Sequence, residues 1–283
     1  MAADIWFTER QTSDVTLGLR VREVLWQEET PYQHLMVAET AAYGRLLTLD
    51  GAVQTTERDE FFYHEMIAHV PLTVHPRPRR VAVVGGGDGG VIREILRHPE
   101  VGVAHLVEID GRVMEAGRRF FPQLSAELDN PRAEIHLVDG IQWMREQGLQ
   151  DAKLDVVIVD STDPVGPATG LFGEVFYRSV HDALGPDGVL VAQTESPMLQ
   201  PHLIQQAQAA MRAVFPHVYL YLAPVPTYPS GWWSFSLASK GPRPENARAV
   251  RLPTRYWTPA IQQAAFVLPP FLARLLSQAG VAG

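Results

Sequence analysis

The chain has 283 residues, of which 46% are hydrophobic and 20% charged, a composition that excludes disordered and fibrous classes and fits one large or two modest globular domains. Its 24 Lys and Arg against 32 Asp and Glu give a net charge of −8, which argues against nucleic acid or an anionic membrane as the main partner and favours a cationic ligand. The absence of cysteine excludes disulfides, thiolate metal sites and a cysteine nucleophile.

The N-terminal segment is expected to form an antiparallel β domain. Residues 1–58 contain short runs of Thr, Val, Tyr and Leu, with turn residues such as Asp50-Gly51 between them, a pattern typical of β-hairpins. Residues 1–10 lack the basic and apolar regions of a signal peptide, so the sequence predicts a cytoplasmic protein.

A helix is predicted to follow over residues 59–70. Phe62, Met66 and Val70 recur at four-residue spacing, as on the apolar face of an amphipathic helix. We expect this helix to end before Pro71, because proline disrupts a helix interior.

The remaining chain predicts a doubly wound, mostly parallel Rossmann-like sheet of the class I methyltransferase type, in a catalytic domain of residues 59–283. Short β-branched runs alternate with helical stretches, which is typical of right-handed βαβ units. The charge-free segment 213–239 contains four prolines, so strands at 218–222 and 232–238 are favoured over a membrane helix. The predicted parallel strands cover residues 81–84, 104–109, 134–138, 156–159 and 189–193.

Carboxylates follow the first four of these strands, where ligands of such sheets bind. The glycine loop 85–90 fits a dinucleotide fingerprint, a weak signal alone, but its Asp88 would repel a pyrophosphate. Glu108, 21 residues after Gly87, is placed to accept ribose hydroxyls, and Asp139 to accept from the amine of adenine. Solvated strand ends or helix N-caps are the alternative for Glu108 and Asp139. The three acids together favour an adenosine with positive charge, as in S-adenosyl sulfonium compounds.

Two further acids, Asp160 and Asp163, follow the fourth strand. A turn or Asx cap before Pro164 is the ordinary role of such residues. In a site that already holds a cation, their mutual repulsion would be relieved by a second cation. A diamine or polyamine would supply it.

The sequence closely resembles the spermidine synthase (polyamine aminopropyltransferase) family. The similarity extends in the family's order from residue 31 to residue 231. It is carried by PYQ at 31–33, the segment from Gly44 to Gln54, DEFFYHEM at 59–66, the loop 85–90, VEID at 107–110, Asp139-Gly140, DSTDPVGP at 160–167, QTESP at 193–197 and PTYPSG at 226–231.

This resemblance implies transfer of the aminopropyl group of decarboxylated S-adenosylmethionine to putrescine, with Asp160 as the proton acceptor. The donor is a co-substrate, and no cofactor is expected. Cadaverine, agmatine and spermidine remain alternative acceptors, and a homodimer or homotetramer joined through the N-terminal hairpins is expected. By motif position, the donor would contact Gln33, Gln54, Asp88, Glu108, Asp139, Gly140 and Pro167, and the polyamine would contact Tyr63, His64, Asp88, Asp160, Asp163, Tyr228 and, as a further candidate for its remote ammonium, Glu195.

Several other features leave alternatives open. His64 and His69 are five residues apart, whereas metalloprotease histidines are four apart, so no metal site is expected and His69 is predicted to be half-buried. The segment 161–176 is either a mobile lid or an ordinary loop, and the ring of Trp232 either lies under the acceptor chain or fills the core. A methyltransferase and a non-catalytic polyamine-binding protein are the competing functions; Asp88 and Asp160 argue against them.

Overall fold

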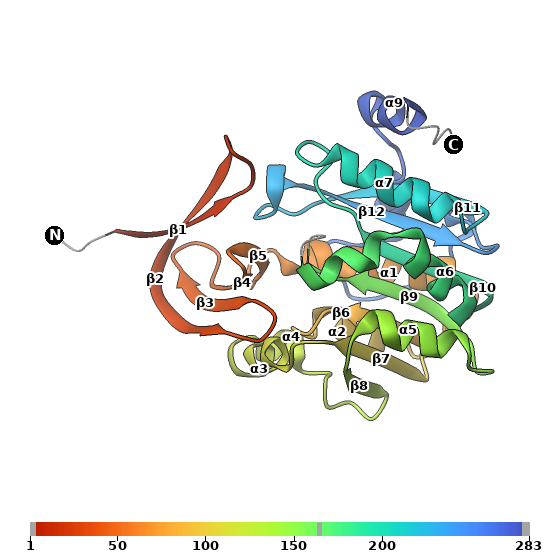
Figure 1. Cartoon of the computed structure of the whole chain (residues 1–283), viewed down its shortest axis with the longest axis horizontal. Helices are drawn as coiled ribbons and strands as arrows, with labels where there is room; N and C mark the ends of the chain where they lie inside the picture. Colours follow the sequence, from red (N-terminus) through yellow and green to blue (C-terminus); the bar gives the residue numbers. More distant parts are fainter. Residues whose placement is uncertain (1–3, 163–165, 279–283) are drawn as a thin grey trace.

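The computed structural model describes residues 4–162 and 166–278 and contains two β-sheets beside one another (Figure 1). The first sheet is antiparallel in the order β1-β2-β3-β4-β5, and the second has the order β11-β12-β10-β9-β6-β7-β8. The strands are β1 Ile5–Arg10, β2 Thr16–Glu29, β3 His34–Thr40, β4 Arg45–Leu49, β5 Ala52–Thr56, β6 Arg80–Gly85, β7 Val103–Glu108, β8 Ala133–Leu137, β9 Leu154–Asp160, β10 Leu184–Gln193, β11 His217–Pro224 and β12 Trp232–Ser239. The α-helices are α1 Glu60–Val74, α2 Gly90–Leu96, α3 Gly111–Phe120, α4 Pro122–Ser125, α5 Gly140–Gly148, α6 Glu174–Ala183, α7 Pro201–Arg212, α8 Pro259–Ala265 and α9 Pro270–Gln278.

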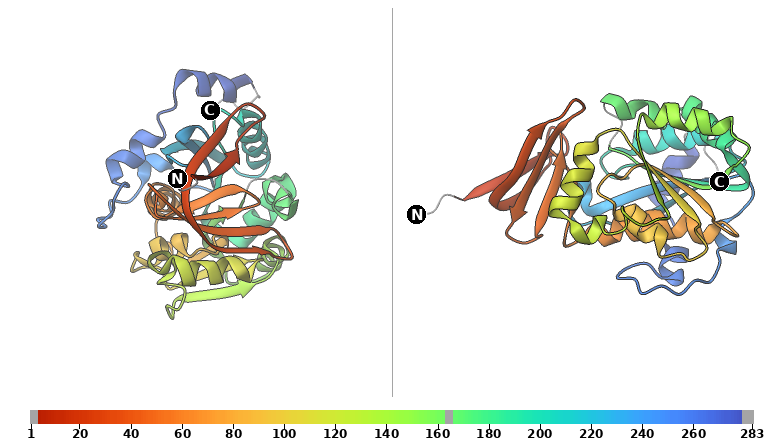
Figure 2. Two further views of the ribbon diagram at one scale, coloured as in Figure 1. Left: turned by 90° about the vertical axis from the view of Figure 1, so that its left-hand side faces the viewer. Right: turned by 90° about the horizontal axis from the view of Figure 1, so that it is seen from below.

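The first sheet confirms the predicted antiparallel hairpins. It stands at one end of the molecule, and β1 and β2 extend beyond the second sheet (Figures 1 and 2). Its inner strands bury Leu35 and Leu47 against Val113 and Phe120 of α3. This apolar contact fixes the first sheet at the edge where the parallel strands of the second sheet end.

The second sheet confirms the doubly wound prediction. Strands β10, β9, β6, β7 and β8 run parallel, and β12 and β11 extend the sheet antiparallel beside β10. Helices α1 and α2 cover one face, and α5, α6 and α7 cover the other (Figure 2). Because both faces are buried, the central strands are continuous apolar runs rather than alternating ones.

Helix α1 differs from the prediction in length and in burial. It continues through Pro71 to Val74, and every residue except Phe61 and Phe62 is buried, so both the end before Pro71 and the amphipathic character were wrong. The Thr73 hydroxyl donates to the carbonyls of the preceding turn, and Arg248 donates to the last carbonyls of the helix. The donors from Arg248 satisfy carbonyls that a helix end leaves without intrahelical partners, so the last turn is stabilised although it contains a proline.

No helix in the described part of the chain combines the length and the apolar character needed to cross a bilayer. The segment 213–239 instead supplies β11 and β12, as predicted.

Candidate active site

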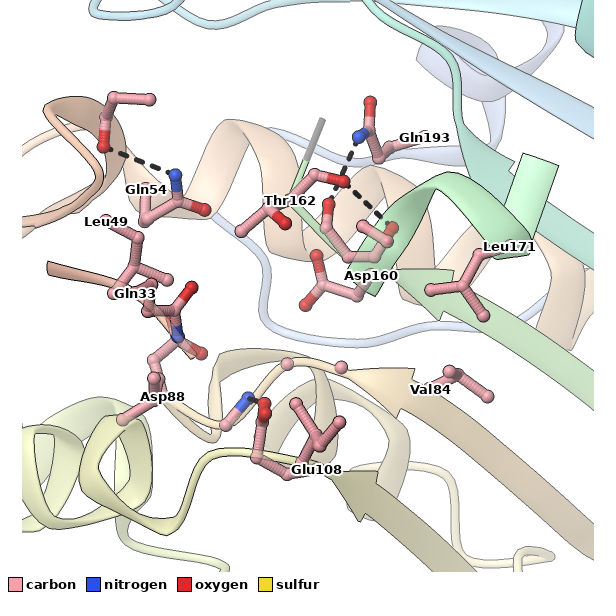
Figure 3. Close-up of a pocket in the computed structure, with 18 of the residues that line it drawn as sticks. Gln33, Leu49, Gln54, Val84, Asp88, Glu108, Asp160, Thr162, Leu171 and Gln193 are labelled. Carbon is pink, nitrogen blue, oxygen red and sulfur yellow. Dashed lines mark hydrogen bonds between the residues drawn. The ribbon is translucent and has the colours of Figure 1, made fainter. Parts of the chain in front are cut away.

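A cavity of about 400 Å³ lies where the first sheet meets the carboxyl ends of β6, β7 and β9. Figure 3 shows Gln33 and Gln54 facing it from the first-sheet side, with Asp88 and Glu108 below them and Asp160 on the opposite side of the cavity from Gln33 and Gln54. The expected residues that line it are Gln33, Gln54, Tyr63, His64, Asp88, Glu108, Asp139, Gly140, Asp160 and Tyr228. Residues far apart in the sequence therefore share one cavity.

The glycine loop approaches the other strand ends too closely for side chains. Gly85, Gly86 and Gly89 have positive φ angles of 84°, 73° and 89°, which glycine adopts readily. A Cβ on Gly87 would lie 2.7 Å from Glu108 Oε2. Because these glycines have no side chains, the backbone of the loop forms the floor of the cavity and leaves the cavity open.

The Asp88 side chain accepts a hydrogen bond from the first residue of α2. Its Oδ1 accepts a hydrogen bond of 2.8 Å from the Gly90 amide, so a backbone donor that could serve a phosphate in a dinucleotide site is occupied by a carboxylate. This arrangement suits a cationic ligand.

Glu108 lies buried between two backbone amides. Its Oε2 accepts from Gly87 at 3.1 Å and its Oε1 from Asp110 at 2.9 Å. Burial raises the pKa of Glu108 to about 7, although these hydrogen bonds oppose the shift. The Asp110 side chain in turn accepts hydrogen bonds from the Gln33 side chain at 3.0 Å and from the Thr30 hydroxyl at 2.8 Å. Asp110 therefore positions both Glu108, through its amide, and Gln33, through its carboxylate.

Asp139 is both a helix cap and part of the cavity wall. Its Oδ1 accepts from the Ile141 amide at 2.7 Å, which realises the N-cap alternative for this residue. A Cβ on the adjacent Gly140 would lie 2.5 Å from Val84 Cγ1. Glycine is thus required for α5 to start this close to β6.

Asp160 ends β9 and receives a hydrogen bond of 2.6 Å from the Tyr63 hydroxyl. Withdrawal from water and the charge of Asp88 raise the pKa of Asp160 to about 6, whereas His64 and the bond from Tyr63 lower it. Its pKa therefore lies nearer to neutral pH than that of an ordinary aspartate, as a general base requires.

His64 is buried between two carboxylates. Its Nδ1 lies 2.7 Å from Glu60 and its Nε2 lies 3.5 Å from Asp88. Burial alone would lower the pKa of His64, but these two acids raise it to about 10, so the ring is protonated. Arg93 forms a 2.8 Å ion pair with Glu60. Sequence reasoning missed the role of Glu60, which the i, i+4 spacing to His64 could have revealed.

Aromatic rings line the remaining wall. The Tyr228 ring centroid lies 5.5 Å from that of Tyr63 and 4.8 Å from that of Trp233, and all three residues line the cavity. Trp232 packs instead on Phe271, so the core-filling alternative holds for its ring.

Glu9, for which the sequence made no prediction, lines the cavity, whereas Glu195 does not. Of the described acids expected at the site, Glu195 does not line the cavity, because it follows β10 at a turn with a φ of 71°. Glu9, from β1, lines the cavity and is only 6% exposed. No sequence pattern brought Glu9 near the strand ends.

The other expectations are met unevenly. Asp163 and the side chain of Pro167 lie outside the described residues, so the alternatives of a mobile lid and an ordinary loop at 161–176 both stay open. His69 is fully buried rather than half-buried, because its ring projects from α1 between His98 at 3.0 Å and Glu94 of α2 at 3.1 Å.

Comparison with known proteins connects this site with one group of enzymes. A family model described as "Spermine/spermidine synthase domain" matches residues 60–248, and one described as "Spermidine synthase tetramerisation domain" matches residues 5–57. The polyamine aminopropyltransferase of Moorella thermoacetica is 53% identical over 96% of each chain, and that of Bacillus subtilis is 47% identical over 97% of this chain and 99% of its own.

Solved structures agree with the sequence comparisons. A spermidine synthase in complex with the transition state analogue AdoDATO is similar with a TM-score of 0.93 and 39% identity, over 97% of this chain and 95% of that chain. The spermidine synthase of Thermotoga maritima gives a TM-score of 0.92 at 38% identity, over 98% and 96%.

Proposed function

This chain belongs to the spermine/spermidine synthase family, and we propose that it is a polyamine aminopropyltransferase that converts putrescine and decarboxylated S-adenosylmethionine into spermidine and methylthioadenosine. The observation that carries this proposal is the convergence of Asp88, Glu108 and Asp160 on one cavity. A negative cavity with a nucleoside-binding carboxylate suits two substrates that are both cations.

The donor lies along the ends of β6, β7 and β8. Glu108 accepts hydrogen bonds from the ribose hydroxyls. Gln33 and Gln54 contact the donor from the first sheet, and Asp139 and Gly140 border the adenine. Asp88 pairs with the amine of the aminopropyl group. Intact S-adenosylmethionine carries a carboxylate beside that amine, which Asp88 would repel.

The reaction is a displacement at carbon. The acceptor nitrogen attacks the methylene carbon bonded to sulfur, the carbon–sulfur bond breaks, and its electron pair neutralises the sulfonium as methylthioadenosine leaves. Asp160 accepts the proton that the nitrogen loses. Holding nitrogen, carbon and sulfur in line supplies much of the acceleration, and Tyr63 orients the Asp160 carboxylate.

The acceptor lies along the rings of Tyr63, Tyr228 and Trp233. We assign its remote ammonium to Glu9, since this buried carboxylate lines the cavity and Glu195 does not. Cadaverine, agmatine and spermidine differ from putrescine in length or end group, so the position of Glu9 bears on the choice among them.

Assembly through the first sheet is part of this proposal. Ile5 and Trp6 on the edge strand β1 and Val24 on β2 are exposed, and open edge strands with apolar side chains favour pairing with another copy. A homotetramer is favoured over a homodimer by the description of the family model matched at residues 5–57. A cytoplasmic location stays a prediction.

The decisive experiment offers the purified protein both donors with a panel of diamines. We expect methylthioadenosine release with the decarboxylated donor and putrescine, and little product with intact S-adenosylmethionine. Formation of S-adenosylhomocysteine would instead identify a methyltransferase. Binding of polyamine without any nucleoside product would identify a non-catalytic protein.

A further inference from the structure

A cluster of possible metal ligands lies outside the cavity, on the edge of the second sheet. His105 is on β7, and Glu134 and His136 are on the neighbouring edge strand β8. The strands run parallel, with His105 opposite Glu134 and Val107 opposite His136. Within the described residues, this is the one group of three such side chains whose ligand atoms all lie within 4.8 Å of one another.

The distances in this cluster match a tetrahedral metal centre. His105 Nδ1 lies 3.2 Å from His136 Nε2 and 3.2 Å from Glu134 Oε2. Metal–ligand bonds of about 2.0 Å at tetrahedral angles place neighbouring ligand atoms about 3.3 Å apart. Little movement of the three side chains would therefore be needed to hold an ion.

Hydrogen bonds alone do not account for both contacts of His105 Nδ1. His105 Nδ1 faces a carboxylate oxygen and an imidazole nitrogen at the same distance, and a single proton on Nδ1 makes one good hydrogen bond. A cation between the three atoms would use all three lone pairs at once.

We propose that His105, Glu134 and His136 form a binding site for a divalent transition metal such as Zn²⁺, with water as the fourth ligand. Two imidazole nitrogens and one carboxylate oxygen are a donor set that Zn²⁺ binds well and that Mg²⁺ does not prefer. The site was not expected from the sequence, because its ligands come from two strands rather than from one spaced motif.

The position of the site links it to the donor-binding end of the sheet. His105 lies three residues before Glu108, and His136 lies three residues before Asp139. An ion held by both strands would connect β8, which has only one neighbouring strand, to β7. Metal binding should therefore stabilise the edge that carries these two residues.

Ring packing is the competing explanation. Trp143 of α5 lies with its ring centroid 5.6 Å from that of His105 and 5.3 Å from that of His136, and such a trio could be held by contact alone. Packing and metal binding differ in one respect: only a metal site takes up a cation in fixed proportion.

The test uses full-length protein without an affinity tag, freed of metal with a chelator and titrated with Zn²⁺ by calorimetry. We expect one ion per chain and a higher melting temperature with Zn²⁺ than without it. His136→Gln and Glu134→Gln should each weaken binding more than about 10-fold. His202→Gln, which changes an exposed histidine elsewhere, is the matched control and should bind as the wild type does.

X-ray absorption on the zinc-loaded wild type makes the test independent of any variant. The expected spectrum has two imidazoles in the first coordination shell, and His136→Gln, checked for native circular dichroism, should lose one of them. The proposal is overturned if the wild type takes up no Zn²⁺, or if both variants bind it with unchanged affinity and stoichiometry.

Discussion

The Tyr63 hydroxyl donates a hydrogen bond of 2.6 Å to Asp160 Oδ1. Burial and the charge of Asp160 hold the pKa of Tyr63 well above its ordinary value, so the phenol keeps its proton and remains a donor. The bond leaves the second oxygen of Asp160 available to a substrate proton. It also stabilises the ionised carboxylate, because a donor to the charged form lowers the pKa of an acid.

Replacing Tyr63 with Phe should therefore move the pH dependence of turnover. Without the donated bond, the pKa of Asp160 rises above its value of about 6, and activity, which needs the ionised form, is lost at a higher pH. We expect the acidic limb of the kcat profile to shift upward by about 1 pH unit. Tyr219→Phe, in a ring that packs on Phe266 away from the cavity, is the control; an equal shift in it, or none in Tyr63→Phe, contradicts this account.

Asp160→Asn should lower kcat by about 10²–10⁴-fold while changing the donor dissociation constant much less. The amide keeps the shape of the side chain but cannot accept the proton of the attacking amine. Single-turnover rates and calorimetric donor binding separate the two effects. Asp182→Asn, at an exposed position, should leave both quantities unchanged, and a fully active Asp160→Asn enzyme would remove Asp160 from the mechanism.

Asp88→Asn tests how the donor is chosen. Loss of the charge should weaken binding of the decarboxylated donor by about 10-fold or more, the equivalent of one charge-assisted hydrogen bond. The ratio of its affinity to that of intact S-adenosylmethionine should therefore decrease. Competition calorimetry with both compounds measures the ratio. Asp151→Asn, in an exposed loop, serves as the control, and an unchanged ratio in Asp88→Asn would exclude repulsion by this carboxylate as the cause of discrimination.

Much of the fold could be predicted because local patterns and tertiary structure agree there. The β-branched runs on β6, β7, β9 and β10 could be recognised because these strands are buried on both faces. The end of α1 could not be predicted in the same way. The helix continues past Pro71 to a last turn in which Arg248, from a distant part of the chain, donates to the carbonyls of Leu72 and Thr73, and no local pattern contains that contact.

The site likewise contains residues that the sequence predicts and residues that only the tertiary structure brings together. Residues at strand ends, such as Glu108 and Asp160, follow from the topology of a parallel sheet, which brings these ends to one edge. Glu9 could not be found, since the packing of β1 over the cavity depends on how the two sheets meet. The pairing of Glu60 with Arg93, 33 residues away, and that of His105 with His136 across two strands depend equally on tertiary structure.

The raised pKa of Glu108 predicts a pH dependence of nucleoside binding. Methylthioadenosine is uncharged, so its affinity reports on the protein's own groups. Only the ionised carboxylate can accept from both ribose hydroxyls, and its pKa in the free protein is about 7. Affinity should therefore fall about 10-fold for each pH unit below that value. In Glu108→Gln, affinity should be lower and independent of pH in this range, whereas the exposed Glu146→Gln should behave as the wild type; a flat wild-type profile contradicts the ribose assignment.

The ion pairs of His64 predict loss of stability at alkaline pH. Its folded-state pKa of about 10 lies above the ordinary value of 6.5, because Asp88 and Glu60 outweigh the effect of burial. The stability contributed by the protonated ring is therefore fully present below pH 6.5 and is lost as the pH rises through 10. Between these pH values the free energy of unfolding of the wild type should fall by at least about 2 kcal/mol more than that of His64→Gln, since one pKa unit corresponds to about 1.4 kcal/mol. Urea unfolding across this range measures the difference, with the exposed His202→Gln as the control.

Parallel pH profiles for wild type and His64→Gln would show that the ring is uncharged in the folded protein. The contacts that link Arg93, Glu60, His64 and Asp88 would then need another explanation.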